Sequence, residues 1–219
     1  MITTATSSVR PDFRRNRLLQ TLAAGFAVYW LAMAVAPVYR FDWFLENLLV
    51  FVAAAAFAAS YRAFPFSDLS YVLLTAFLAL HTLGSHYTYA EVPFGYWLQD
   101  IFGSSRNDYD RLVHFSWGLL IAYPARELLI RLARIRGAWA YFLALCMILA
   151  MSAGFEIIEW IIALIVSPRA AFAYLGTQGD EFDAVKDMAL ALAGAVAALG
   201  ITAAVSATPP ARRRLARKS

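Results

Sequence analysis

The chain has 219 residues, of which 61% are hydrophobic and only 16% are charged. This composition excludes an ordinary water-soluble domain, because a folded chain of this size would lack the polar residues needed to cover its surface. The net charge of +4 at pH 7 does not indicate nucleic acid, because the basic residues form short clusters beside apolar runs and no soluble basic face.

The apolar runs predict an all-α fold, a polytopic transmembrane helical bundle with six spans. A span needs about 20 mostly apolar residues. In chain order the runs cover residues 18–36, 43–60, 69–83, 112–130, 138–166 and 184–205. Pro124 interrupts the fourth run, but backbone groups freed by a proline can be satisfied inside a bundle. The sequence therefore predicts a membrane domain over 18–206, between a basic segment over 1–17 and a basic tail over 207–219.

The distribution of Lys and Arg predicts the orientation, since cytoplasmic loops retain positive charge. Six spans place both termini on one side. That side holds 14 of the 19 basic residues and 3 of the 15 acids, a net charge of +11, whereas the opposite side holds five basic residues and 12 acids, a net charge of −7. We therefore expect both termini in the cytoplasm.

Carboxylates and imidazoles gather at the outer ends of four predicted spans. The set comprises His81 in the third span, Asp110 and His114 in the fourth, Glu156 and Glu159 in the fifth, and Asp180, Asp183 and Asp187 at the start of the sixth. Within each span the members are three or four residues apart, so they share one face of the helix. A charged side chain facing lipid costs a few kcal/mol, on the order of 2.5–3.5, which predicts that these faces turn toward one shared outer pocket.

The mixture of imidazoles and carboxylates predicts a divalent-metal site in this pocket. We expect zinc or manganese, because a carboxylate-only set would suit magnesium or calcium better. The predicted metal ligands are His114, Glu156, Glu159, Asp183 and His81.

Two further acids are the catalytic candidates, Asp187 as a general base and Asp110 as the acceptor that orients His114. His86 and Asp180 are additional candidates for the pocket. Structural roles compete with each assignment: Asp110 and Asp180 suit helix N-termini, and a lone histidine on an apolar helix is usually a hydrogen-bonded packing residue. Glu156 and Glu159 are the hardest to explain structurally, because two acids on one face of an apolar helix are costly without partners.

The segment between the third and fourth spans, residues 84–107, is rich in aromatic residues. It is typical of an interfacial aromatic belt. The alternative is a lid over the pocket, which would bring His86, Tyr87 and Glu91 toward the acids.

Four sequence blocks together resemble the YjdF-like family of bacterial inner-membrane proteins. They are His81-Thr-Leu-Gly-Ser-His86-Tyr-Thr-Tyr89, Asn107-Asp-Tyr-Asp110-Arg-Leu-Val-His114-Phe, Glu156-Ile-Ile-Glu159-Trp, and Leu175-Gly-Thr-Gln-Gly-Asp180 continuing to Asp187. A fainter similarity, carried by Asp110-Arg-x-x-His114-Phe, is to the VanZ-like proteins. The first resemblance implies a multi-span inner-membrane protein and brings no activity with it.

The sequence therefore favours a membrane protein with an outward-facing site for a divalent metal or for a cationic or hydroxylated ligand. With a metal, the site would act in hydrolysis or transfer on a lipid-linked substrate. Two alternatives use the same residues differently. A transporter or proton-coupled carrier would use the carboxylates as a relay, and an interaction protein of the cell envelope would use them to hold its helices together. Beyond the lipid bilayer and this lipid-linked molecule, the sequence indicates no partner.

Overall fold

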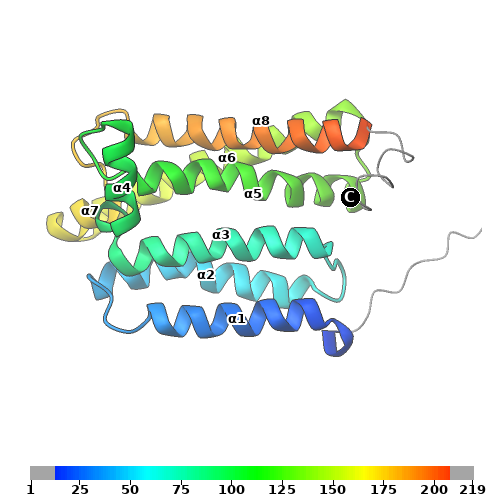
Figure 1. The fold of residues 1–219 in the computed structure, drawn as a ribbon, viewed down its shortest axis with the longest axis horizontal. Helices are drawn as coiled ribbons and strands as arrows, with labels where there is room; N and C mark the ends of the chain where they lie inside the picture. The colour runs from blue at the N-terminus through cyan, green and yellow to red at the C-terminus, as the bar shows by residue number, and fades with distance from the viewer. Residues whose placement is uncertain (1–12, 208–219) are drawn as a thin grey trace, which may run out of the picture.

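The protein is described by a computed structural model over residues 13–207, and all regular elements in this range are helices (Figure 1). The six long helices are α1 (Arg17–Met33), α2 (Arg40–Ser60), α3 (Asp68–Tyr87), α5 (Tyr109–Arg131), α6 (Ala138–Ile165) and α8 (Asp183–Ala207). The short elements are η1 (Phe13–Arg15), η2 (Tyr89–Glu91), α4 (Pro93–Phe102) and α7 (Pro168–Leu175).

The long helices lie side by side, and α4 and α7 sit together at one end of the bundle (Figure 1). Each long helix coincides with one predicted apolar run, and α5 passes through Pro124 without a break. The predicted basic segments over 1–17 and 207–219 lie largely outside the described residues.

The segment over 84–107 differs from the irregular loop that the sequence suggests. Helix α3 continues four residues past its predicted end, and the middle of the segment forms α4. Pro93 opens α4, a position where its missing N–H costs nothing, and Gly103 ends it with φ +62°. Several aromatic side chains of α4 are exposed, among them Trp97 and Phe102, which is the arrangement expected of an interfacial belt.

Helices α5 and α8 approach so closely that their backbones touch. A Cβ on Gly118 would lie 1.8 Å from the carbonyl oxygen of Ala191, and a Cβ on Gly194 would lie 2.0 Å from that of Phe115. Only glycine fits at these two positions, as is common where membrane helices cross closely.

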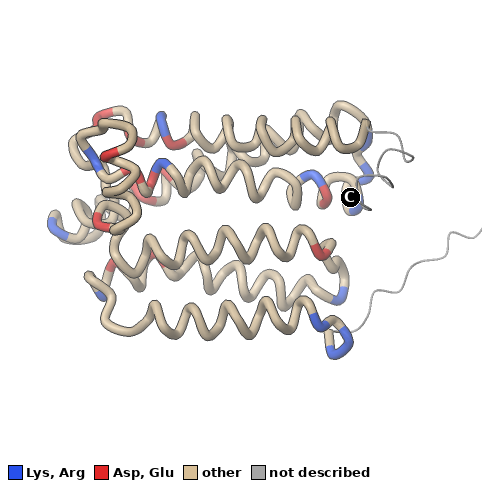
Figure 2. Tube along the Cα trace, viewed as in Figure 1, with Lys and Arg blue, Asp and Glu red and all other residues tan. Residues whose placement is uncertain are grey.

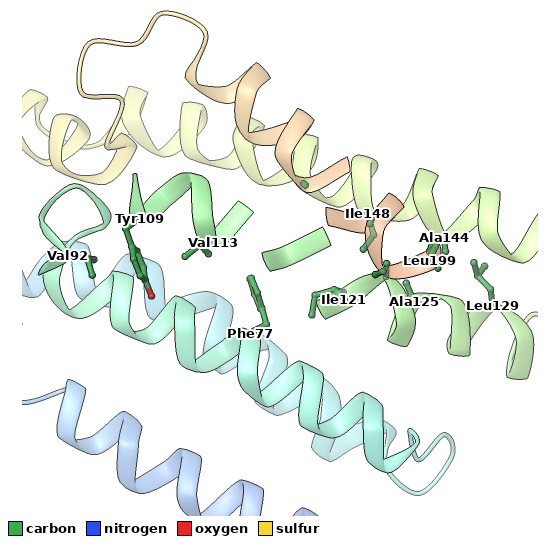
Figure 3. Packing of buried hydrophobic residues seen from close by; sticks show 14 residues of the cluster. Phe77, Val92, Tyr109, Val113, Ile121, Ala125, Leu129, Ala144, Ile148 and Leu199 are labelled. Carbon is green, nitrogen blue, oxygen red and sulfur yellow. The ribbon is translucent and has the colours of Figure 1, made fainter. Parts of the chain in front are cut away.

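The core fills the space between α3, α5, α6 and α8 (Figure 3). In the half of the bundle far from α4 and α7, Ile121, Ala125, Ala144, Ile148 and Leu199 are all at most 7% exposed. This half is packed with apolar side chains.

Four helices, α2, α3, α6 and α8, are long and apolar enough to cross a membrane. Helix α1 has 17 residues, and α5 carries Asp110 in its first turn and Arg131 in its last. Charged residues lie mainly at the two ends of the bundle (Figure 2). We call the end with α4 and α7, where α5 and α8 begin, the acidic end, and the opposite end, where α5 and α8 finish, the basic end.

Candidate functional site

Two arginines cross-link α5, α8 and the loops before them at the acidic end. The guanidinium of Arg111 donates from Nη1 to Asp187 Oδ1 at 2.6 Å and from Nη2 to Asp180 Oδ2 at 2.9 Å and Asp183 Oδ1 at 2.7 Å. Arg111 therefore holds three acids around the start of α8. Charge-assisted bonds of this kind are the stronger ones in proteins.

The second arginine, Arg106, lies in the loop before α5 and is 8% exposed. It donates to Asp183 and, at 3.3 Å, to Asp110 Oδ2, and it also reaches the carbonyl oxygens of Gly176 and Thr177. Arg106 thus ties the α7–α8 loop to the start of α5.

Asp180 is the outermost acid of this network. Lys186 Nζ lies 2.7 Å from Asp180 Oδ2, and this hydrogen bond lowers the pKa of Asp180. Asp180 is therefore ionised and forms ion pairs with Lys186 and Arg111.

Three of the candidate residues converge beside this network. One ligand atom each from Asp110, His114 and Asp187 lies within 4.8 Å of the other two. Each carboxylate also has a second oxygen away from its arginine, since Arg106 approaches Asp110 Oδ2 and Arg111 approaches Asp187 Oδ1. An imidazole and two carboxylates are suitable ligands for a divalent metal ion.

Glu156 of α6 borders this three-residue group. Its Oε1 lies 3.7 Å from His114 Nε2, on the same ring nitrogen that is 3.5 Å from Asp110 Oδ1. Glu156 Oε1 is buried and has no hydrogen-bond partner among the described residues. A small shift would bring Glu156 into the group as a fourth ligand.

A cavity of about 270 Å³ lies next to the group, between α2, α3, α5, α6 and α7. Most of its wall is apolar, with Leu49, Phe77, Val113, Trp117, Met151, Phe155 and Ile158 among the lining residues. Its polar lining consists of Glu46, His81, Tyr89, Asp110, His114, Ser152, Glu159 and Tyr174. The cavity therefore offers both an apolar volume and a polar wall, and two of the three converging residues line it.

His81 is held by hydrogen bonds at both ring nitrogens. Nε2 lies 2.9 Å from the carbonyl oxygen of Glu46, and Nδ1 lies 2.5 Å from the hydroxyl of Tyr89. A carbonyl can only accept, so in the neutral ring Nε2 carries the hydrogen and Nδ1 accepts from Tyr89. Burial raises the pKa of Tyr89, which keeps its hydroxyl protonated as the donor.

The structure brings some of the predicted site residues together and separates others. Asp110, His114, Asp187 and Glu156 meet at one point, and Glu159 lies nearby on the cavity wall.

The remaining candidates lie around that point. Asp183 and Asp180 are bound by the arginines, and His81 lines the cavity but has both nitrogens engaged. His86 is not among the lining residues, and its Nδ1 is 2.8 Å from the carbonyl oxygen of Met33 at the end of α1.

Sequence reasoning missed a carboxylate from a fifth helix. Glu46 of α2 lines the cavity, and its side chain is 3% exposed. The signal was available, because Asp42 and Glu46 are four residues apart in a mostly apolar helix and so share a face, as Glu156 and Glu159 do. Ser152 and Tyr174 were missed as well, and nothing in their local sequence distinguishes them.

Helical structure, apolar spans and ion pairs at the helix ends define this chain as an integral membrane protein. It matches the family described as "Predicted membrane protein (DUF2238)" over residues 18–208, and it belongs to that family. It is also 37% identical, over 180 residues, to the inner membrane protein YjdF of Escherichia coli (strain K12), an alignment that covers 82% of this chain and 86% of that protein. No solved structure matches the chain. The resemblance drawn from the sequence blocks is confirmed.

Proposed function

We propose that this protein binds a lipid-linked molecule in the cavity and a divalent metal ion at Asp110, His114 and Asp187. The metal ion would then catalyse hydrolysis of the bound molecule, or transfer of a group from it, on the outward side of the membrane. The observation that carries the proposal is the position of the three converging ligand atoms on the edge of a largely apolar cavity. A metal ion placed there could polarise a phosphoryl or carbonyl oxygen of the bound molecule.

The topology that goes with this function has six spans and both termini in the cytoplasm. Helices α1 and α5 lie alongside the four clear candidate spans, and the basic end carries the arginines of η1, α5 and the loop before α6 (Figure 2). Because positive charge stays in the cytoplasm, the acidic end faces outward. A C-terminal fusion to a phosphatase that works only outside the cytoplasm should be inactive, and an active fusion would reverse this orientation.

A lipid-linked molecule is favoured by the way the cavity meets the surface. Met151 and Ile158 of α6 line the cavity and are also 50% and 52% exposed. Helix α2 supplies the opposite wall through Leu49, and α7 packs against both α2 and α6. The exposed side chains of membrane helices meet acyl chains, so a lipid tail could enter between α2 and α6, beneath α7.

The packing of the basic half supports a binding or enzymatic role over a carrier. Among the described residues, no carboxylate, histidine or lysine lies between the cavity and Glu127 on α5, at the far end. A proton-coupled carrier usually needs polar groups that continue the path across the membrane.

Elemental analysis of the purified protein tests the metal site. After incubation with zinc or manganese and removal of free ions, we expect about one ion per chain, since three side-chain ligands suffice for a metal site. The ion should be lost in His114→Ala and in Asp187→Asn. His86→Ala is the matched control, because His86 lies outside the converging group. If the folded wild-type protein takes up neither ion, the metal part of the proposal is wrong.

A further inference from the structure

The cavity wall carries acidic side chains without a basic partner on the same wall. Glu46 and Glu159 line it, together with Asp110, which pairs with Arg106 outside the wall, and no lysine or arginine is among the described lining residues. Arg106 and Arg111, the arginines nearest to this wall, are committed to the aspartates of the ion network. The polar part of the cavity therefore lacks a fixed positive charge of its own.

Glu46 is the clearest sign of a missing partner. Its side chain is 3% exposed, and Oε2 has no hydrogen-bond partner among the described residues. His81 Nε2 lies 3.9 Å from Oε2, and the hydrogen on this nitrogen points instead to the Glu46 carbonyl oxygen at 2.9 Å. A buried carboxylate without a donor is costly, so a ligand that donates hydrogen bonds to Glu46 would remove this cost.

The neighbouring wall suits a positive charge better than a neutral donor. Aromatic rings of Tyr89, Tyr174 and Phe77 line the cavity together with Glu46. Ring faces attract cations, and the attraction grows where water is excluded. An anionic head group would instead meet Glu46 and Glu159 with no basic side chain on the wall to bind it, and a neutral hydroxyl lacks the charge that ring faces attract.

We propose that the cavity selects a lipid whose head group carries an amine, with the ammonium group between Glu46 and Glu159 and the acyl chain along the apolar wall toward Met151. This inference rests on the lipid-binding part of the proposed function and does not depend on the metal ion. It also accounts for Ser152 on the same wall. The Ser152 hydroxyl is buried with no hydrogen-bond partner among the described side chains and backbone groups, and it can donate to an ester carbonyl beneath the head group.

Native mass spectrometry of the detergent-released protein can measure the preference. The probes are phosphatidylethanolamine and phosphatidylglycerol with identical acyl chains, and free ethanolamine as a competitor. A charge-assisted hydrogen bond to a buried group predicts that phosphatidylethanolamine binds about tenfold more tightly. In Glu46→Gln, and more fully in Glu46→Gln with Glu159→Gln, this ratio should fall to within about twofold, with phosphatidylglycerol binding retained as evidence of folding. Glu181→Gln, an exposed acid at the same end, is the matched control and should keep the full ratio.

A cavity-blocking variant separates this inference from the proposed function. Met151→Trp should weaken the binding of both lipids. If Met151→Trp leaves both unaffected, lipid binding in the cavity is wrong and this inference falls with it. If Met151→Trp blocks both lipids but the wild-type protein binds them equally, only the amine preference is overturned. Displacement of the lipid by millimolar ethanolamine would assign the site to a free amine and overturn the lipid part.

Discussion

The two ends of the bundle differ in how many hydrogen-bond donors surround a buried glutamate. At the basic end, Glu127 of α5 accepts hydrogen bonds from the Ser67 amide at 2.9 Å, the Ser67 hydroxyl at 2.7 Å and the Ser70 hydroxyl at 2.5 Å, and it also pairs with Arg131. At the acidic end, Glu46 is more deeply buried, with 3% of its side chain exposed against 8% for Glu127, and yet its Oε2 has no hydrogen-bond partner among the described residues.

We propose that this contrast distinguishes acids that stabilise the fold from acids that bind a ligand. The chain can supply four donors to a carboxylate where the fold needs it, as Glu127 shows. An acid that is buried without such donors lowers the stability of the fold. In membrane proteins, acids of this kind are typical of ligand-binding sites. Glu46 and Glu156 fall in this second class, whereas the aspartates bound to Arg106 and Arg111 have features of both.

The largest effect is expected from Arg111→Met. This change leaves Asp187 without its arginine and Asp183 with Arg106 alone, and breaking a buried ion pair from one side typically costs about 3–5 kcal/mol. The free energy of unfolding in a titration with sodium dodecyl sulfate should fall by that order. Arg62→Met removes an exposed arginine at the basic end and should change it little. A loss below 1 kcal/mol for Arg111→Met would show that the network does not stabilise the α5–α8 pair.

A smaller loss is expected from Glu127→Gln. The amide keeps the shape of the side chain but presents N–H groups to the serine donors, and losing hydrogen bonds to a charged group costs about 1.5–3 kcal/mol. The same titration measures the effect, with the exposed Glu91→Gln as the matched control. An unchanged stability would contradict the structural role assigned to Glu127.

The smallest effect, and one of opposite sign, is expected from Glu46→Gln. Removing an acid that has no donor should leave the unfolding free energy unchanged or raise it by up to about 1 kcal/mol. A loss as large as that of Glu127→Gln would mean that Glu46 has a structural partner, and the contrast between the two ends would disappear. The protein should be measured free of added phosphatidylethanolamine, since a bound ligand would stabilise the wild type selectively.

Most of the bundle followed from the sequence because hydrophobic runs of span length have few alternative structures in lipid. The observed α5, Tyr109–Arg131, extends the predicted run over 112–130 by only a few residues. Helix α4 was not predicted, because its ten residues are too short for a strong periodic signal and lie among prolines and glycines.

The candidate site was only partly predictable for a different reason. Spacing shows which side chains share a face of one helix, but it does not show how that helix is rotated toward its neighbours. The convergence of Asp110 with Asp187, and the pairing of Arg111 with Asp183 across 72 positions in the chain, depend on how α5 and α8 pack. Glu46 was not predicted as a site residue, because the sequence identifies α2 as a span but does not show that it forms a wall of the cavity.

The glycine contacts between α5 and α8 have a consequence for how relatives of this protein can diverge. With backbones that touch at Gly118 and Gly194, this pair cannot slide or spread without losing its packing, so the residues it carries keep a fixed geometry. Leu49, Met151 and Ile158, on α2 and α6, are under no such constraint. If relatives bind ligands of different size, we therefore expect their substitutions at cavity-lining positions of α2 and α6, and not at the glycine contacts between α5 and α8.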